Sequence, residues 1–195
     1  MPAPTAAIIL AGGQGSRLGG VRKADLVVRG ERLLDHVLAA AEQCRTRVVV
    51  GYEDLAVPPG VLLTREDPPG SGPAAGVAAG MELVGEVEWV LTLACDLPGI
   101  STAVPALLEA AEKARENIDA ISASSENRLE WLVSIHRKES LRNAIINQPG
   151  GVVNCSMRRL YSELNWEQVA VPPTSTRDID TWEDFGEWEQ KVGRT

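Results

Sequence analysis

Residues 6–23 read AAIILAGGQGSRLGGVRK, and this stretch decides the predicted fold. The apolar run 6–11 has the length and composition of a buried strand, and the glycine pair that follows it marks a turn. Five of the nine residues 12–20 are glycine. Without a Cβ, their backbone N–H groups can point inward together as a nest for an anion, and Arg17 and Lys23 add positive charge. The stretch therefore predicts a strand that leads into a phosphate-binding loop.

Two common phosphate loops do not fit these residues. A GxGxxG motif read from Gly13 requires glycine at position 18, where the chain has Leu18. A GxxxxGKS or GxxxxGKT motif requires a hydroxyl residue after the lysine, where the chain has Ala24. The residues therefore indicate a phosphate loop of a third kind.

Strands and helices alternate along the rest of the chain. Apolar residues recur at helical spacing in some segments and form short runs rich in β-branched residues in others. Repeated βα units with nearly continuous apolar strands predict a three-layer α/β/α fold with a mostly parallel, Rossmann-like sheet. The expected strands are residues 6–11, 47–50, 61–63, 89–95, a segment near 120, 131–135 and 168–171, and the expected helices are 33–41, 74–84, 104–115, 139–147, 157–164 and one from 181.

Length and composition favour one domain, residues 1–195. A chain of 195 residues lies below the size at which single cores stop growing, and 44% apolar residues supply the core. The net charge of −8 opposes binding to nucleic acid or to anionic membranes. Residues 1–50 nevertheless carry seven basic and four acidic side chains. A small anion could therefore bind near the N-terminus.

The cysteines and the start of the chain indicate a cytoplasmic protein. Cys44, Cys95 and Cys155 lie far apart without a CxxC pair, so neither a zinc site nor a disulfide framework is indicated. Residues 1–5 lack the basic region and apolar core of a signal peptide. No apolar run approaches the roughly 18 residues that span a bilayer.

A carboxylate follows one of the expected strands directly. Asp96 comes at the end of the apolar run 89–95 and precedes Leu97 and Pro98. Ligands of open parallel sheets bind beyond the carboxyl ends of the strands, and carboxylate oxygens suit Mg²⁺. An Asp at this point can also be a simple turn former, so the residues alone leave both roles open.

The glycine loop carries a family resemblance. The pattern LAGGxGxRLGGxxK at residues 10–23 resembles the signature of nucleotidyltransferases, and specifically of the MobA-like molybdenum cofactor guanylyltransferases. Its general part is shared with sugar-phosphate nucleotidyltransferases, whereas the pair Gly19-Gly20 is closer to the molybdopterin branch. Arg22 stands where that branch usually has an acid.

Three further segments share this resemblance, so that it covers nearly the whole chain. Residues 66–76 resemble DxxxxxGPLAG with a shortened spacer, and residues 95–98 resemble CDxP. Residues 178–185 resemble DxDTPEDL, with Trp182 in place of proline. The resemblance implies a nucleotidyltransferase domain with a nucleotide-binding half at about 1–100 and an acceptor-binding half at about 101–195.

The resemblance also implies roles for individual residues. It makes Arg17, Lys23 and Asp96 catalytic and gives Mg²⁺ the ligands Asp96 and Asp180, although Asp180 could instead cap the closing helix. Residues 127–138, with Trp131, His136 and Arg137, resemble the part that faces the acceptor, and strand packing explains Trp131 equally well. The implied nucleotide-binding residues are Leu10, Ala11, Gly12, Gly13, Gly15, Arg17, Lys23, Asp67, Gly72, Pro73 and Gly76.

The activity that the resemblance implies is the Mg²⁺-dependent transfer of GMP from GTP to the phosphate of molybdopterin, with release of pyrophosphate. GTP and molybdopterin or molybdenum cofactor would be its substrates, and molybdenum-insertion proteins and apo-molybdoenzymes further partners. The alternatives are a cytidylyltransferase for the same pterin, a sugar-phosphate nucleotidyltransferase, or a nucleotide-binding protein without turnover. Gly72-Pro73 and Asp96-Leu97 favour guanine, since the cytidylyltransferases tend to lack GPxAG and to carry CDQP.

Overall fold

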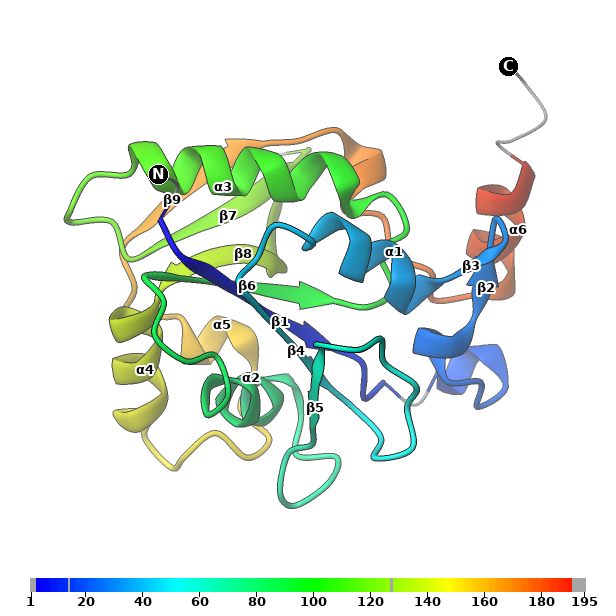
Figure 1. Cartoon of the computed structure of the whole chain (residues 1–195), viewed down its shortest axis with the longest axis horizontal. Helices are drawn as coiled ribbons and strands as arrows, with labels where there is room; N and C mark the ends of the chain where they lie inside the picture. Colours follow the sequence, from blue (N-terminus) through cyan, green and yellow to red (C-terminus); the bar gives the residue numbers. More distant parts are fainter. Residues whose placement is uncertain (1–2, 14, 127, 191–195) are drawn as a thin grey trace.

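One mixed sheet organises the part of the chain that the computed structural model describes, residues 3–13, 15–126 and 128–190. Within those residues the sheet has seven strands in the order β5-β4-β1-β6-β8-β7-β9, and β2 and β3 form a separate hairpin (Figure 1). The strands are β1 Thr5–Leu10, β2 Val27–Val28, β3 Glu31–Arg32, β4 Thr46–Val50, β5 Leu62–Thr64, β6 Trp89–Ala94, β7 Ala120–Ser125, β8 Arg128–Arg137 and β9 Trp166–Ala170. The α-helices are α1 Leu33–Ala40, α2 Pro73–Met81, α3 Ala103–Lys113, α4 Lys138–Ile146, α5 Met157–Leu160 and α6 Trp182–Gln190, and the short 3-10 helices are Ser16–Leu18, Lys23–Asp25, Ile100–Thr102 and Pro173–Ser175.

The predicted mostly parallel sheet is confirmed, with one strand reversed. β1 pairs in parallel with β4 and β6, β4 with β5, and β7 with β9. β8 runs antiparallel between β6 and β7. Only a short connection joins β7 to β8, and parallel neighbours would need a crossover of a dozen or more residues. The reversal therefore follows from the length of that connection.

Two apolar layers cover the faces of the sheet and confirm the three-layer prediction. Alternate residues of β1 face opposite sides, so that Ala7 and Ile9 pack in the layer of α1 and α3. Ala6 and Ile8 pack in the layer of α2, α4 and α5. Strands that are buried on both sides need apolar residues at every position, which explains the unbroken run in the sequence.

The hairpin of β2 and β3 is absent from the sequence-based prediction. Its turn residues Arg29 and Gly30 both have positive φ angles, of 54° and 84°, as in the two-residue turn that matches strand twist. Strands of two residues are too short to show an alternating pattern, so nothing in the sequence marked them. The hairpin lies beside α6 in Figure 1 and shares a third apolar cluster with it through Val28 and Trp188.

The predicted helices and strands are present with shifted ends. The strand expected at 131–135 extends over 128–137, and the basic helix expected at 157–164 is the single turn 157–160. No helix within the described residues is long and apolar enough to cross a membrane.

Candidate functional site

A cavity of about 500 Å³ opens at the carboxyl ends of β1, β4 and β6. Strands that are parallel end on the same edge of a sheet, so residues far apart in the chain meet there. Eight of the residues expected to contact the nucleotide or metal line this cavity. They are Leu10, Gly12, Gly13, Lys23, Gly72, Pro73, Gly76 and Asp96.

Gly15 shapes the glycine loop without lining the cavity. Its φ of 50° lies in the left-handed region, and a Cβ there would collide with the carbonyl oxygen of Val21. Its own carbonyl accepts hydrogen bonds from the N–H groups of Leu18 at 2.8 Å and Gly20 at 3.1 Å. Ala11 is likewise buried, and its N–H donates to Val50 O at 2.7 Å. Both residues therefore set the path of the loop behind the cavity wall.

The ammonium of Lys23 lies between two carboxylates from distant parts of the chain. Its Nζ donates to Asp96 Oδ2 at 2.6 Å and also to Asp180 Oδ1. Lys23 and Asp96 side chains are only 13% and 15% exposed. Burial opposes the charge of Lys23, but the charge of Asp96 and the hydrogen bonds to both acids outweigh it and raise the lysine pKa. Lys23 is therefore fully positive in this cluster.

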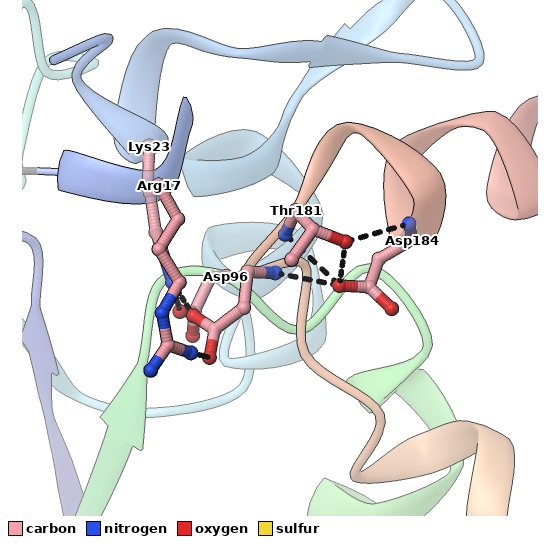
Figure 2. Close-up of polar contacts among 6 residues, drawn as sticks. Arg17, Lys23, Asp96, Thr181 and Asp184 are labelled. Carbon is pink, nitrogen blue, oxygen red and sulfur yellow. Dashed lines mark hydrogen bonds and ion pairs between the residues drawn. The ribbon is translucent and has the colours of Figure 1, made fainter. Parts of the chain in front are cut away.

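Arg17 stands at the outer edge of the same cluster. Figure 2 shows Arg17 and Lys23 reaching from the glycine loop toward the acidic side chains. The Arg17 side chain is 73% exposed, and its one ion pair among the described residues joins its Nη1 to Asp180 Oδ2 at 3.4 Å. A long, solvated pair of this kind is weak. The Arg17 guanidinium therefore remains available to an incoming anion.

Asp180 faces the lysine and does not cap α6. A reciprocal pair of hydrogen bonds between Thr181 and Asp184 caps α6. The Thr181 N–H donates to Asp184 Oδ2 at 2.9 Å, and the Asp184 N–H donates to Thr181 Oγ1 at 3.2 Å (Figure 2). The side chain of Thr181 therefore fills the capping role that the sequence left open for Asp180. This leaves the Asp180 carboxylate directed at Lys23.

A third carboxylate, from Asp178, completes the acidic cluster. One oxygen each from Asp96, Asp178 and Asp180 lie within 4.8 Å of one another. The N–H of Ile179 donates to Asp96 O at 3.1 Å, which holds the 178–180 segment against the end of β6. Partial desolvation and the charges of Asp96 and Asp180 raise the pKa of Asp178. Asp178 was not among the expected metal ligands, although the DxD spacing pointed to it.

At the other end of the cavity, Glu66 stands where Asp67 was expected. Asp67 is exposed and does not line the cavity, whereas its neighbour Glu66 does. The Glu66 Oε1 atom accepts a hydrogen bond from the N–H of Gly70 at 2.8 Å, which orders the loop before α2. Gly72 precedes Pro73 at the first position of α2 with a φ of 88°. The shortened spacer between Glu66 and Gly72 is the sequence feature that made the register ambiguous.

Arg22, which departs from the family pattern, has its own partner outside the cavity. Its guanidinium donates to both oxygens of Asp54, at 2.8 and 3.0 Å. It also lies over the ring of Tyr52, 4.5 Å from the centroid. Arg22 therefore ties the glycine loop to the segment after β4.

His136 does not face an acceptor. It is fully buried, and its Nε2 lies 2.9 Å from Ser134 Oγ and 3.2 Å from Thr92 Oγ1. The Tyr161 hydroxyl joins this cluster at 3.3 Å from Thr92 Oγ1. Burial lowers the pKa of His136 to about 3, so the ring is neutral. The acceptor role suggested for His136 is therefore wrong, and Asn127, in the same segment, lies outside the described residues.

Comparisons with known proteins identify sequence relatives of this chain. The sequence pattern of the MobA-like NTP transferase domain matches residues 7–168. A molybdenum cofactor guanylyltransferase from Bradyrhizobium sp. (strain ORS 278) is 29% identical over 94% of this chain and 91% of its own length.

Solved structures show the same fold. Molybdopterin-guanine dinucleotide biosynthesis protein A from Archaeoglobus fulgidus superposes with a TM-score of 0.71 over 97% of this chain and all of its own, at 20% identity. A 4-diphosphocytidyl-2C-methyl-D-erythritol synthase from Anaerococcus prevotii gives 0.76 at 14% identity, over 99% of this chain and 97% of its own. The fold is therefore common to relatives that carry different names.

Proposed function

Because the chain belongs to the MobA-like NTP transferase family, we propose that it transfers GMP from GTP to the terminal phosphate of molybdopterin or molybdenum cofactor. The products are molybdopterin guanine dinucleotide and pyrophosphate. One observation carries this proposal: Lys23 and Asp96 meet Asp180 at the mouth of a cavity that the glycine loop also lines. The acceptor and the base are taken from the guanylyltransferase that aligns over 94% of the chain.

The reaction needs positioning and charge neutralisation more than a general base. A phosphate acceptor is already an anionic nucleophile at neutral pH, so no side chain has to remove a proton from it. The N–H groups of Gly12 and Gly13, together with Lys23 and Arg17, supply donors for the triphosphate. Fixed donors of this kind stabilise charge that develops on the leaving pyrophosphate without reorganising during the reaction. Among the described residues that line the cavity, none is a histidine.

The acidic cluster fits Mg²⁺. Asp96 and Asp180 supply hard oxygen donors, and Asp178 supplies a third carboxylate within 4.8 Å. These carboxylates would hold the ion, which would supply positive charge against the phosphates. The positive charge of Lys23 now holds two of these carboxylates together. The Lys23 ammonium would supply a further positive charge to the phosphates.

A nucleotide panel tests the proposal. The full chain is incubated with molybdopterin, Mg²⁺ and one of GTP, CTP, ATP or UTP, and the release of pyrophosphate is measured. The Asp96→Asn variant is the matched control. We expect release with GTP that depends on both the acceptor and Asp96.

Each alternative has its own outcome once a sugar phosphate is added as a second acceptor and thermal melting is measured with each nucleotide. Release with CTP in place of GTP would identify a cytidylyltransferase. Release with a sugar phosphate as acceptor, and none with molybdopterin, would identify a sugar-phosphate nucleotidyltransferase. Nucleotide-dependent thermal stabilisation without any pyrophosphate would identify a binding protein that does not turn over.

A further inference from the structure

One guanidinium beside the nucleotide cavity has no role in the family pattern. Arg65 directly follows β5 and lines a small recess of about 20 Å³. The recess shares Gly12, Glu66 and Gly70 with the larger cavity, so the two spaces adjoin. The Arg65 guanidinium lies over the ring of Tyr52, 5.2 Å from its centroid. An arginine is thereby held in a recess that adjoins the nucleotide cavity.

The donors of Arg65 are unused by the residues that the structure describes. Among the residues that the structure describes, the Arg65 side chain makes no hydrogen bond or ion pair. The carboxylate that feels its charge, that of Asp54, is bound through both oxygens by Arg22. Arg22 therefore removes the obvious partner, and the fork of Arg65 donors is left for a ligand. The ring of Tyr52 restricts where the guanidinium can lie without consuming those donors.

The place of Arg65 along the sheet edge selects the part of the nucleotide that it can contact. β5 is three strands from β6 in the order β5-β4-β1-β6, which corresponds to about 14 Å at the usual strand spacing (Figure 1). Asp96 and Lys23 lie at the β6 end, and the cavity runs from there past Val50 to Glu66. With the reacting phosphate at Asp96, the nucleoside end of the ligand extends toward β4 and β5. Arg65, in the recess that shares Glu66 and Gly70 with the cavity, therefore lies beside the end of the cavity that would receive the base.

We propose that Arg65 is a specificity-determining residue that donates to O6 and N7 of the guanine base. These two atoms are adjacent acceptors, and a guanidinium offers two parallel donors at matching spacing. Adenine presents a donor amino group beside N7 and cytosine presents a donor at N4, so neither accepts the same pair of bonds. This inference deepens the proposed function and rests on it, because it presumes that GTP is the substrate.

The test measures binding without turnover. Dissociation constants of the full chain for α,β-methylene analogues of GTP, 7-deaza-GTP, ATP and CTP are measured with Mg²⁺ and without acceptor. The variants are Arg65→Ala and Arg65→Gln, with Arg142→Ala, an exposed arginine of α4, as the matched control. Because the Arg65 side chain makes no hydrogen bond to any residue that the structure describes, both variants should fold. Thermal melting checks this expectation.

We expect Arg65→Ala to raise the dissociation constant for the GTP analogue about tenfold to a hundredfold, the range that one bidentate base contact contributes. The dissociation constant for the ATP analogue should change less than about twofold. The wild type should prefer GTP over 7-deaza-GTP, which lacks N7, and this preference should vanish in both Arg65 variants. Equal weakening of the GTP and ATP analogues, or no weakening at all, would overturn the role of Arg65 while leaving guanylyl transfer intact. A wild type that prefers the CTP analogue would overturn both proposals, so the two failures are distinguishable.

Discussion

Two polar clusters lie along β6, one beyond its carboxyl end and one in its interior, and they differ in charge. The edge cluster, defined as Lys23, Asp96, Asp178 and Asp180 with Arg17, lies where β6 ends. The interior cluster, defined as Thr92, Ser134, His136 and Tyr161, lies between β6 and β8 and is almost completely shielded from solvent. Only four positions separate Thr92 from Asp96.

The comparison shows where this fold keeps ionised groups. In the interior cluster, burial lowers the pKa of His136 and raises that of Tyr161, so that both side chains stay neutral. In the edge cluster, the nearby carboxylates raise the pKa of Lys23 despite burial. The edge cluster sets two cations, Lys23 and Arg17, against three carboxylates, whereas the interior cluster is held by hydrogen bonds between neutral groups. We therefore expect edge substitutions to affect turnover and interior substitutions to affect stability.

The largest expected effect is on turnover. Lys23→Ala and Asp96→Asn should each lower the rate of pyrophosphate release by about 10²–10³, the usual effect of removing one donor or charge at a reacting phosphate. Thermal melting should show that both variants remain folded. Lys113→Ala, which removes an exposed lysine on α3, should match the wild-type rate. A wild-type rate in Lys23→Ala or Asp96→Asn would show that the altered residue lacks the role assigned here.

An intermediate effect is expected on stability. Thr92→Val removes a hydroxyl within 2.9 Å of Ser134 Oγ and 3.2 Å of His136 Nε2, and leaves buried groups without a partner. The free energy of unfolding in urea should fall by about 1–3 kcal/mol, with nucleotide affinity unchanged. The same substitution at Thr46, at the partly exposed start of β4, should stay within about 0.5 kcal/mol of the wild type. A loss of nucleotide affinity in Thr92→Val would break the distinction between the two clusters.

The last effect, a pH dependence of stability from His136, is small near neutral pH. Its folded pKa of about 3 lies below the unfolded value of 6.5, so the unfolded chain binds the extra proton first as the pH falls. Stability from this residue is complete above pH 6.5 and declines by up to about 1.4 kcal/mol per pH unit toward pH 3. The free energy of unfolding is measured in urea at several pH values between 6.5 and 5. It should fall more steeply with decreasing pH for the wild type than for His136→Gln. Equal slopes would mean that His136 is protonated in the folded protein.

Local features of the sequence predicted most of the fold. The apolar run of β1, the glycine content of the loop and the helical spacing of α1 depend on neighbours within a few residues, so they are readable from the chain alone. The two-residue strands β2 and β3 were missed because they are too short for any period to appear. The reversal of β8 was missed because strand direction depends on the length of a connection whose ends the sequence marks poorly.

Through its family resemblance, the sequence by itself also predicted functional roles for Arg17, Lys23 and Asp96, and left Asp180 open between a metal ligand and a helix cap. Only the tertiary structure decided how these residues meet. Lys23 bonds to acids 73 and 157 positions away, and such contacts depend on the order of strands in the sheet. The same holds for the choice of Glu66 over Asp67 at the cavity wall, and for the capping of α6 by Thr181. Side-chain direction and pairing are set by packing between distant segments, which a local pattern does not encode.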